Sequence, residues 1–301
     1  MRSEPSAPFL RNATGEETQA LSSLDGGRLP THLAVIMDGN RRWARSRSLP
    51  SLMGHRAGVR AFRDVVRACS DLGIRVLTAY AFSLENWKRS ESEVGLLMRL
   101  FEHYSRKDRA DMLSNGVRFR VIGDVESLPA RVREAFAETS RVTAGNSRLI
   151  LNLAVNYGSR GELVRAARAL AAEVRDGRLD AEAICEADIE RNLHTVGLPD
   201  PDLLIRTSGE IRVSNFLLWQ MAYTEFWFTE RCWPDFRRID LVHALLDYQT
   251  RERRYGGGSA EAPRALDPSL LSLDAEVARL DPGRSERTML EGASALDEVN
   301  R

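Results

Sequence analysis

The sequence has few lysines, few cysteines and no long apolar run. Lysine occurs only twice among 301 residues, and basic and acidic residues balance at 43 each. A net charge of zero provides no overall field that attracts nucleic acid, so no nucleic-acid partner is expected. No apolar run reaches the roughly 18 residues of a membrane-spanning helix. The three cysteines lack metal-ligand spacing, and an odd number of scattered thiols fits a cytoplasmic protein in a reducing environment.

The two ends of the chain differ in composition from its centre. Residues 1–29 are rich in Ser, Gly, Glu and Thr and lack the apolar core of a signal peptide. We expect them to form a disordered N-terminal extension. The glycines at 256–258 indicate a hinge, followed by a flexible C-terminal tail at 258–301. Residues 30–257 remain as one domain that is long enough to bury a substantial core.

Apolar runs alternate with helical periodicities through this central domain. Strands are predicted at 32–36, 75–82, 117–122, 149–155 and 203–205, and helices at 55–72, 91–113, 129–143, 162–175 and 239–249. Runs such as Leu149–Leu151 lack polar alternation, which indicates strands covered on both faces. The pattern predicts an α/β fold with a mostly parallel central sheet flanked by helices.

A carboxylate, a glycine and two arginines follow the first predicted strand, in the segment Met37–Trp43. Ligands of open α/β sheets bind beyond the carboxyl ends of the strands. Asp38 could bind a hard cation such as Mg2+, and Gly39 allows close approach of the backbone. A helix that begins near Arg41 would point N–H groups at an anion. The segment indicates a metal-bridged diphosphate site, although an ordinary strand-to-helix turn with a solvated basic pair would also explain it.

Three later segments repeat this theme, at residues 79–89, 152–162 and 200–220. With these four motifs in order, the chain from about His32 to Gly257 resembles the cis-prenyltransferase family. The resemblance implies an enzyme that joins isopentenyl diphosphate to an allylic diphosphate, usually farnesyl diphosphate, with new double bonds in cis. It also implies Mg2+ as cofactor, residues 30–257 as the catalytic domain, and a hydrophobic tunnel for the growing chain.

The resemblance also assigns roles to individual residues. The metal would be held by Asp38, with Glu225 as a second metal-associated carboxylate. The allylic diphosphate cradle would comprise Gly39, Asn40, Arg41, Arg42, Trp43 and His55. The isopentenyl diphosphate site would comprise Arg206, Arg212, Val213 and Ser214. The loop between the two sites would comprise Ser83, Leu84, Glu85, Asn86, Trp87 and Arg89.

Two of these residues, Asp38 and Asn86, are the expected catalytic residues. The family assigns Asn86 a part in proton removal, but an amide is a poor base. An alternative is that Asn86 orients isopentenyl diphosphate while a phosphate oxygen takes the proton.

Apolar residues recur at helical spacing in the predicted helix 91–113. Val94, Leu97, Met98, Phe101 and Tyr104 share one face. By itself this stripe favours a core-facing helix, whereas the resemblance implies the wall of the tunnel. An apolar cavity suits a polyprenyl chain, because each buried CH2 group contributes about 0.8 kcal/mol.

Two positions bear on substrate and product. Ser51 stands where the family usually has an arginine, which removes one phosphate contact; Arg45 or Arg47 could compensate. Ala81 keeps the small side chain associated with long products. We therefore predict a long-chain polyprenyl diphosphate such as undecaprenyl diphosphate, which would serve as a cell-wall lipid carrier.

The end of the domain predicts a homodimer. Residues 251–256 resemble the C-terminal element that, in the family, reaches the partner's active site. The apolar segment Ser214–Phe228 fits a dimer interface, and a core hairpin fits it equally well. Peripheral contact with a membrane is a further expectation, because the product is oily.

Two rival functions make different predictions. A dehalogenase-like phosphatase would need a second aspartate at the position of Asn40. A non-catalytic accessory subunit would lack the Asp-Gly-Asn motif and the arginine pair that this chain keeps at 206 and 212.

Overall fold

A six-stranded sheet forms the centre of the computed structural model, which describes residues 14–251. All neighbouring strands are parallel, in the order β3-β4-β2-β1-β5-β6. The strands are β1 (His32–Ile36), β2 (Val76–Ser83), β3 (Val117–Ile122), β4 (Leu149–Tyr157), β5 (Leu203–Arg206) and β6 (Glu225–Phe228). Every residue of β1, β4 and β5 is buried, as expected for strands covered on both faces. The predicted α/β fold with a mostly parallel sheet is confirmed.

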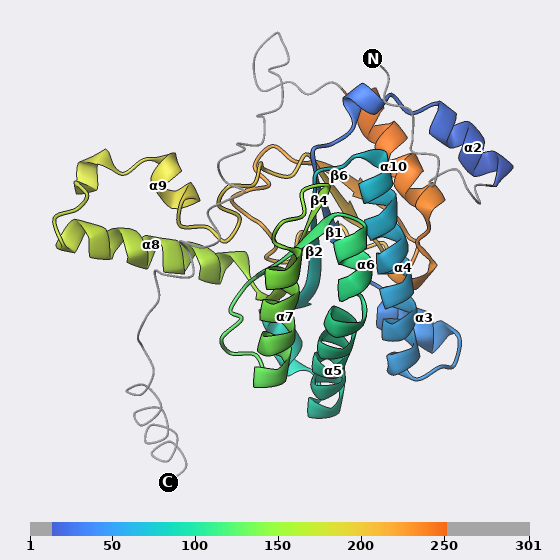
Figure 1. The fold of residues 1–301 in the computed structure, drawn as a ribbon, viewed down its shortest axis with the longest axis horizontal. Coiled ribbons are helices and arrows are strands. Elements are labelled where there is room, and N and C mark those ends of the chain that lie inside the picture. The colour runs from blue at the N-terminus through green and yellow to red at the C-terminus, as the bar shows by residue number, and fades with distance from the viewer. Residues whose placement is uncertain (1–13, 252–301) are drawn as a thin grey trace. The chain divides into compact units, whose positions relative to one another are not determined.

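Parallel pairing requires long crossover connections, and most of those between these strands contain helices, whereas the connection from β5 to β6 at 207–224 contains none. The helices are α2 (Gly15–Ser22), α3 (Asn40–Ser46), α4 (Ser51–Leu72), α5 (Glu91–Lys107), α6 (Arg109–Ser114), α7 (Ala130–Thr143), α8 (Ser159–Arg175), α9 (Glu186–Glu190) and α10 (Arg238–Thr250). Figure 1 shows α4, α5, α6 and α7 together on one face of the sheet. The larger apolar core lies between this helical layer and the sheet. The smaller core, on the other face, is covered by loop residues such as Phe216 and Leu217.

Strand register determines which loops meet. Ile36, the last residue of β1, pairs with Tyr80 on one side and with Arg206 on the other. The segments that follow β1, β2 and β5 therefore emerge at the same edge of the sheet. Tyr157 at the end of β4 pairs with Ser83 at the end of β2, so all four motifs noted in the sequence leave the sheet at this edge.

The N-terminal segment corrects one expectation. Disorder was predicted for residues 1–29, but residues 15–22 form α2. Thr14 and Glu17 form a reciprocal capping box at its start, and Leu21 is buried in the larger core. Glu17 also pairs with Arg238 of α10 at 2.7 Å. The remaining residues of the predicted extension, 1–13, and the predicted tail lie outside the described residues.

Two further boundaries differ from the prediction. The helix expected at 91–113 is divided at Asp108 into α5 and α6. The carboxylate of Asp108 accepts a hydrogen bond from Arg63 Nε of α4 at 2.7 Å, a contact between residues distant in sequence. Strand β6 was not predicted, because its half-buried edge position gives no apolar alternation that distinguishes a strand from an interface segment.

Candidate active site

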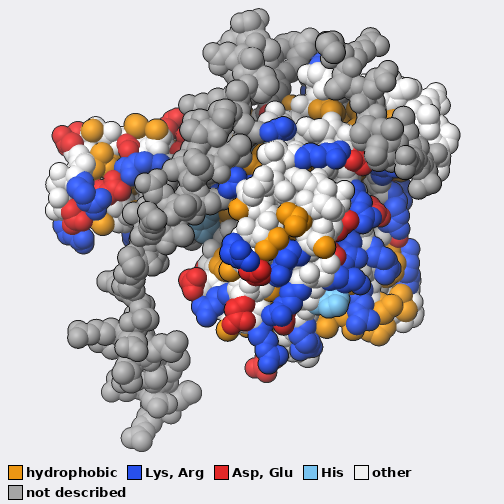
Figure 2. All heavy atoms as spheres, in the orientation of Figure 1, with side chains coloured by type: hydrophobic (Ala, Val, Ile, Leu, Met, Phe, Trp, Pro, Cys, Tyr) orange, Lys and Arg blue, Asp and Glu red, His pale blue; other side chains and the backbone are white. Residues whose placement is uncertain are grey.

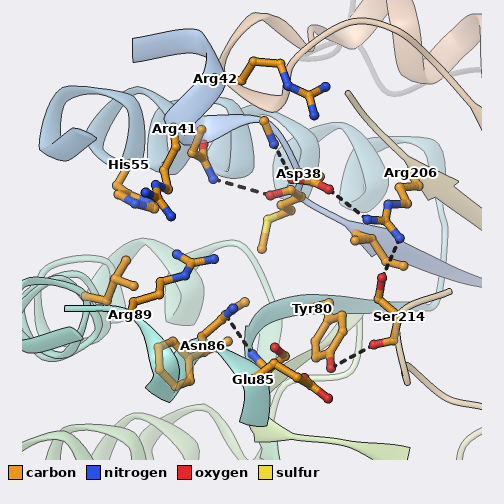
Figure 3. A pocket seen from close by; sticks show the side chains of 18 of the residues that line it. Asp38, Arg41, Arg42, His55, Tyr80, Glu85, Asn86, Arg89, Arg206 and Ser214 are labelled. Carbon is orange, nitrogen blue, oxygen red and sulfur yellow. Dashed lines mark hydrogen bonds and ion pairs between the residues drawn. The ribbon is translucent and has the colours of Figure 1, made fainter. Parts of the chain in front are cut away.

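A cavity of about 760 Å³ opens beyond the carboxyl ends of β1, β2 and β5. It brings together side chains from four separate parts of the chain (Figure 3). The predicted site residues that line it are Asp38, Gly39, Asn40, Arg41, Arg42, His55, Ser83, Glu85, Asn86, Arg89, Arg206 and Ser214.

Asp38 connects two of these parts. One carboxylate oxygen accepts a hydrogen bond from the Gly39 N–H at 2.7 Å, and the other pairs with Arg206 Nη2 at 2.8 Å. The Arg206 side chain is only 3% exposed, whereas that of Asp38 is 37% exposed. An accessible carboxylate of this kind fits Mg2+, which commonly takes one or two protein carboxylates and completes its shell with substrate phosphates and water. Among residues 14–251, no cluster of three or more His, Cys, Asp or Glu could bind a metal by itself.

Two glycines allow the segments around Asp38 to pack closely. Gly39 has φ +100°, and a Cβ there would lie 2.9 Å from the Ser208 side chain. At Gly54 a Cβ would lie 2.0 Å from the carbonyl oxygen of Asn40. The first turn of α4 can therefore contact the start of α3. This contact brings His55, the residue after Gly54, to the cavity.

Basic groups gather on one side of the cavity. Arg41, His55 and Arg89 come from α3, α4 and the loop before α5, and Figure 3 shows them close together. Burial, and then the charge of Arg89, lower the pKa of His55, while nearby Glu93 opposes this shift. Glu93 was not singled out in the sequence.

Arg206 and Ser214 form the opposite side. Arg206 Nη1 donates to the Ser214 hydroxyl at 2.8 Å and to the carbonyl oxygen of Arg212. Ser208 and Ser214 adopt positive φ values of 79° and 50°. Such left-handed backbone costs about 1–3 kcal/mol for a non-glycine residue and is concentrated at functional sites.

Asn86 is held by its own turn. Its side-chain oxygen accepts a hydrogen bond from the Ser83 N–H at 3.0 Å. The amide oxygen is therefore occupied, and the NH2 group remains as a donor. This geometry favours orientation of a ligand over removal of a proton.

Other predicted residues lie outside the cavity lining. Arg212 pairs with Glu210, and Val213 packs against the smaller core. Leu84 lies near Gly158. The Trp87 indole donates to Asn156 Oδ1 at 2.7 Å. These side chains shape the loops rather than the cavity wall.

Trp43 was expected beside the diphosphate cradle, but it faces another part of the surface. Its indole N–H donates to Asp235 at 2.8 Å, and the guanidinium of Arg47 lies 4.4 Å from its ring centre. Arg47 also pairs with Asp235 at 2.9 Å, so it is not directed at the cavity. Of the two arginines proposed to compensate for Ser51, only Arg45 lines the cavity.

Glu225 lies away from the cavity. It begins β6 and pairs in register with Leu203, the first residue of β5. It therefore lies at the amino-terminal edge of the sheet, opposite the edge from which Asp38 emerges. Its carboxylate pairs with Arg251 at 2.9 Å. Within one chain, Glu225 is therefore separated from the cavity around Asp38, and its role as a second metal-associated carboxylate stays a prediction.

The cavity also contains residues that the motifs did not identify. Tyr80 stacks on Phe216 with ring centres 4.4 Å apart, and its hydroxyl donates to the Tyr157 carbonyl oxygen at 3.1 Å. Met37, Phe82 and Asn215 also line the wall. Only their location in the sequence, at the end of a strand or next to a residue with an assigned role, could have indicated them.

A second, apolar cavity of about 140 Å³ lies beside the first. Three residues of the α5 stripe, Leu97, Phe101 and Tyr104, line it, whereas Val94 and Met98 of the same stripe are buried in the larger core. Both cavities share the side chains of Met37, Asn40, His55, Tyr80, Ala81 and Leu97. An engineered apolar cavity of about 150 Å³ binds one benzene molecule, so this cavity holds about one isoprenyl unit as it stands.

Residues 36–256 match the model of the prenyltransferase family named for undecaprenyl diphosphate synthase. The chain belongs to this undecaprenyl diphosphate synthase family. It is 49% identical over 251 residues to an isoprenyl transferase of Heliobacterium mobile, covering 83% of this chain and 96% of that relative. It is 52% identical over 228 residues to an isoprenyl transferase of Agrobacterium fabrum, covering 76% and 92%.

Solved structures of the undecaprenyl diphosphate synthase family and related enzymes are also similar. One is lavandulyl diphosphate synthase from Lavandula x intermedia, solved with dimethylallyl diphosphate; it shares 40% identity and a TM-score of 0.75, with 77% of this chain and 100% of that chain covered. Another is a probable undecaprenyl diphosphate synthase from Campylobacter jejuni, with 33% identity, a TM-score of 0.63, and coverage of 76% and 99%.

Membership of the undecaprenyl diphosphate synthase family makes this protein an isoprenyl transferase. The dehalogenase-like alternative receives no support from these comparisons. The accessory-subunit alternative predicts loss of the Asp-Gly-Asn motif and of the arginine pair, whereas Asp38 and Arg206 are both present and pair with each other at 2.8 Å in the cavity. Among residues 14–251, no helix is long and apolar enough to cross a membrane.

Proposed function

We propose that this transferase joins isopentenyl diphosphate to an allylic diphosphate, with farnesyl diphosphate as primer, and that it forms each new double bond in cis with Mg2+ as cofactor. The observation that carries the proposal is one cavity with two cationic sides. Arg41, His55 and Arg89 lie on one side and Arg206 on the other, with Asp38 as the accessible carboxylate of the site. Each of the two substrates carries a diphosphate group, and each diphosphate needs cationic side chains to bind it.

The basic side chains of the cavity divide between the two substrates in this proposal. Arg41, His55 and Arg89 hold the allylic diphosphate, beside the opening to the apolar cavity. Arg206, fixed by Asp38 and Ser214, holds isopentenyl diphosphate. Arg42 bonds the Ser208 hydroxyl at 2.6 Å and pairs with Glu210 at 2.8 Å, which connects the two halves.

The chemical step is departure of diphosphate from the allylic carbon as that carbon bonds to isopentenyl diphosphate. Asp38 would hold Mg2+, which would supply positive charge for the leaving diphosphate oxygens. The guanidinium groups of Arg41 and Arg89 stabilise the same charge from fixed positions. The NH2 group of Asn86 orients isopentenyl diphosphate, and a phosphate oxygen takes the proton that the new chain loses.

We propose a long-chain product such as undecaprenyl diphosphate, a carrier for cell-wall synthesis. Ala81 lines both cavities and leaves space where the chain would pass. The apolar cavity, at about 140 Å³, holds only the first part of such a chain. Its walls must therefore separate during elongation, and this widening would form the predicted tunnel.

A homodimer and peripheral membrane contact are also proposed. Among the described residues, β6 is an edge strand of the sheet, and a second copy of the chain could pair with this edge. The C-terminal element at 252–256 lies outside the described residues. Leu49 and Met53, each 39% exposed, lie near the exposed Arg56 and Arg60 in sequence. Basic side chains are numerous on the face seen in Figure 2, which suits an anionic membrane surface.

The test is incubation of the protein with Mg2+, farnesyl diphosphate and radiolabelled isopentenyl diphosphate, followed by chromatography of the lipids. A ladder that ends near 55 carbons and disappears with a chelator supports the proposal. Absence of incorporation with any allylic primer contradicts it. Parallel assays of Asn86→Asp and Asn86→Ala test the role of Asn86. Near-normal turnover of both variants would exclude Asn86 both from proton removal and from orientation of isopentenyl diphosphate.

A further inference from the structure

Glu93 faces the three basic groups on the allylic side of the cavity. One oxygen, Oε1, lies 3.0 Å from Arg89 Nη1, 3.6 Å from His55 Nε2 and 3.8 Å from Arg41 Nε. These partners come from three separate segments, whereas the Glu93 side chain is only 12% exposed. A single, largely buried carboxylate thus joins all three.

The local sequence gives Glu93 a different role. Ser90 caps α5 and Glu93 is the third residue of that helix, which is the spacing of a reciprocal capping box. The same spacing at Thr14 and Glu17 of α2 does form that box, with both hydrogen bonds made. In α5 the Ser90 hydroxyl accepts a hydrogen bond from the Glu93 N–H at 3.4 Å. Within residues 14–251, the reciprocal hydrogen bond from the Ser90 N–H to the Glu93 carboxylate is not formed. The carboxylate is directed to the cavity cations instead.

A carboxylate at this point has two opposite effects. It repels the negative diphosphate that the same cations would bind, so it weakens ground-state binding. It also holds Arg89 by a 3.0 Å hydrogen bond and attracts Arg41 and His55 from ion-pair distance, which restricts side chains whose freedom would otherwise have to be lost in each catalytic cycle. The Arg41 side chain is 52% exposed, so without Glu93 it has solvent available as an alternative environment.

We propose that Glu93 is a positioning residue, which directs Arg41, His55 and Arg89 toward the leaving diphosphate before substrate binds. The diphosphate then competes with Glu93 for the same three groups. The inference rests on the proposed function, because it assumes that these groups bind the allylic diphosphate. It goes further in assigning part of the catalytic geometry to a residue that only adjoins the cavity.

The test is Glu93→Gln, which keeps the shape and one acceptor oxygen but removes the charge. The matched control is Glu91→Gln, two residues earlier in the same helix and exposed. Calorimetry measures binding of inorganic pyrophosphate, and steady-state assays measure kcat and the KM of the allylic primer. We expect pyrophosphate to bind several-fold more tightly to Glu93→Gln while kcat falls about 10- to 100-fold. The control should match the unmodified protein in both.

This opposite movement of affinity and rate separates positioning from a structural role. Weaker pyrophosphate binding together with lower kcat, or an unchanged kcat, would overturn the proposal. If Glu93→Gln does not fold, as judged by its melting temperature, Glu93→Asp replaces it; loss of kcat without weaker binding supports positioning, and unchanged kcat overturns it. If the unmodified protein binds pyrophosphate but elongates no allylic primer, the proposed function fails, and with it the positioning role for catalysis. The binding measurement on Glu93→Gln would then show separately whether Glu93 competes with a diphosphate.

Discussion

The two connected cavities of this transferase are held in different ways. The larger one has side chains fixed by directed bonds, such as that of Asp38 to Arg206 at 2.8 Å and of Arg89 to Glu93 at 3.0 Å. The smaller one is bounded by packed apolar side chains of α4, α5 and the sheet. Hydrogen bonds have direction, so they can fix charged side chains before substrate binds. Apolar packing has no such direction, so the apolar wall adjusts to the size of the chain that it encloses. The charged cavity should therefore control rate, and the apolar cavity should control product length.

The largest expected effect comes from the charged cavity. Asp38→Asn keeps the shape of the side chain but removes the charge that pairs with Arg206 and would hold Mg2+. We expect kcat to fall roughly 10³-fold, as for loss of a main electrostatic stabiliser of the transition state. The length of any residual product should not change. The measurement is incorporation of labelled isopentenyl diphosphate, with product length read by chromatography.

The control for Asp38→Asn is Asp64→Asn, an exposed position on α4. If both variants keep activity within tenfold of the unmodified protein, the assignment of Asp38 is wrong. If Asp38→Asn shortens the product, rate and length are not separately controlled, and the comparison between the two cavities fails.

The converse test alters the apolar cavity. Ala81 lines both cavities, so Ala81→Leu places three additional carbon atoms in the path of the chain. We expect shorter products, with the rate of the first condensation changed only a few-fold. Chromatography of the lipids measures the first effect and single-turnover incorporation the second. Ala171→Leu, on the exposed side of α8, is the control. A full-length product from Ala81→Leu would exclude this residue from the path of the chain.

The charged cavity was the more predictable of the two from the sequence. Asp38 and Arg206 each follow a buried strand, and parallel pairing brings the ends of neighbouring strands to one edge. Glu93 was missed because its spacing from Ser90 already has a local explanation in helix capping. Motif matching also assigned Trp43 and Glu225 to the site, although helix orientation and strand register direct them elsewhere.

The apolar cavity depends on contacts that local patterns do not contain. The division between α5 and α6 at Asp108 accompanies a bond to Arg63 on another helix. Apolar spacing alone predicted one continuous helix there. The stripe of α5 was correctly predicted as apolar, but whether it faces core or cavity depends on how far α4 lies from it.

A third prediction concerns stability away from both cavities. Burial lowers the pKa of His32 and of His194 from about 6.5 to about 4. Between these pH values the unfolded state binds protons that the folded state does not, so stability is complete above pH 6.5 and falls as the pH falls toward 4. Each histidine can contribute a loss of about 2 kcal/mol between pH 7.5 and pH 5, and about 3 kcal/mol once the pH is below 4. Urea unfolding at pH 7.5 and pH 5 measures the loss.

The variant His194→Gln should show a smaller decrease between these pH values than the unmodified protein. His194 Nδ1 accepts a hydrogen bond from the Gly123 N–H at 2.9 Å, which glutamine can also accept through its side-chain oxygen. An equal decrease in both proteins would assign the pH dependence to other groups.

The smallest effect is expected at the rim of the charged cavity. Ser51 is the exposed first residue of α4, in the turn before Gly54 and His55. Ser51→Arg adds a cation there, and a solvent-exposed charge contributes at most about 1 kcal/mol, or about fivefold in binding. We expect a KM for the allylic primer lowered about two- to fivefold, with kcat and product length unchanged. Added salt should reduce the gain, because exposed charges are screened.

Arg45 provides the matched comparison for Ser51, because it already lines the cavity and no ion pair to it is found among residues 14–251. Arg45→Gln should raise the primer KM by a similar factor, and Ser51→Arg should restore it in the double variant. Such restoration would mean that a positive charge at either position, 45 or 51, has the same effect on binding of the primer. If each substitution acts independently of the other, Arg45 does not compensate for the arginine that position 51 lacks. If Ser51→Arg instead changes product length, control of the chain extends to the rim of the charged cavity, and the division of roles between the two cavities is wrong.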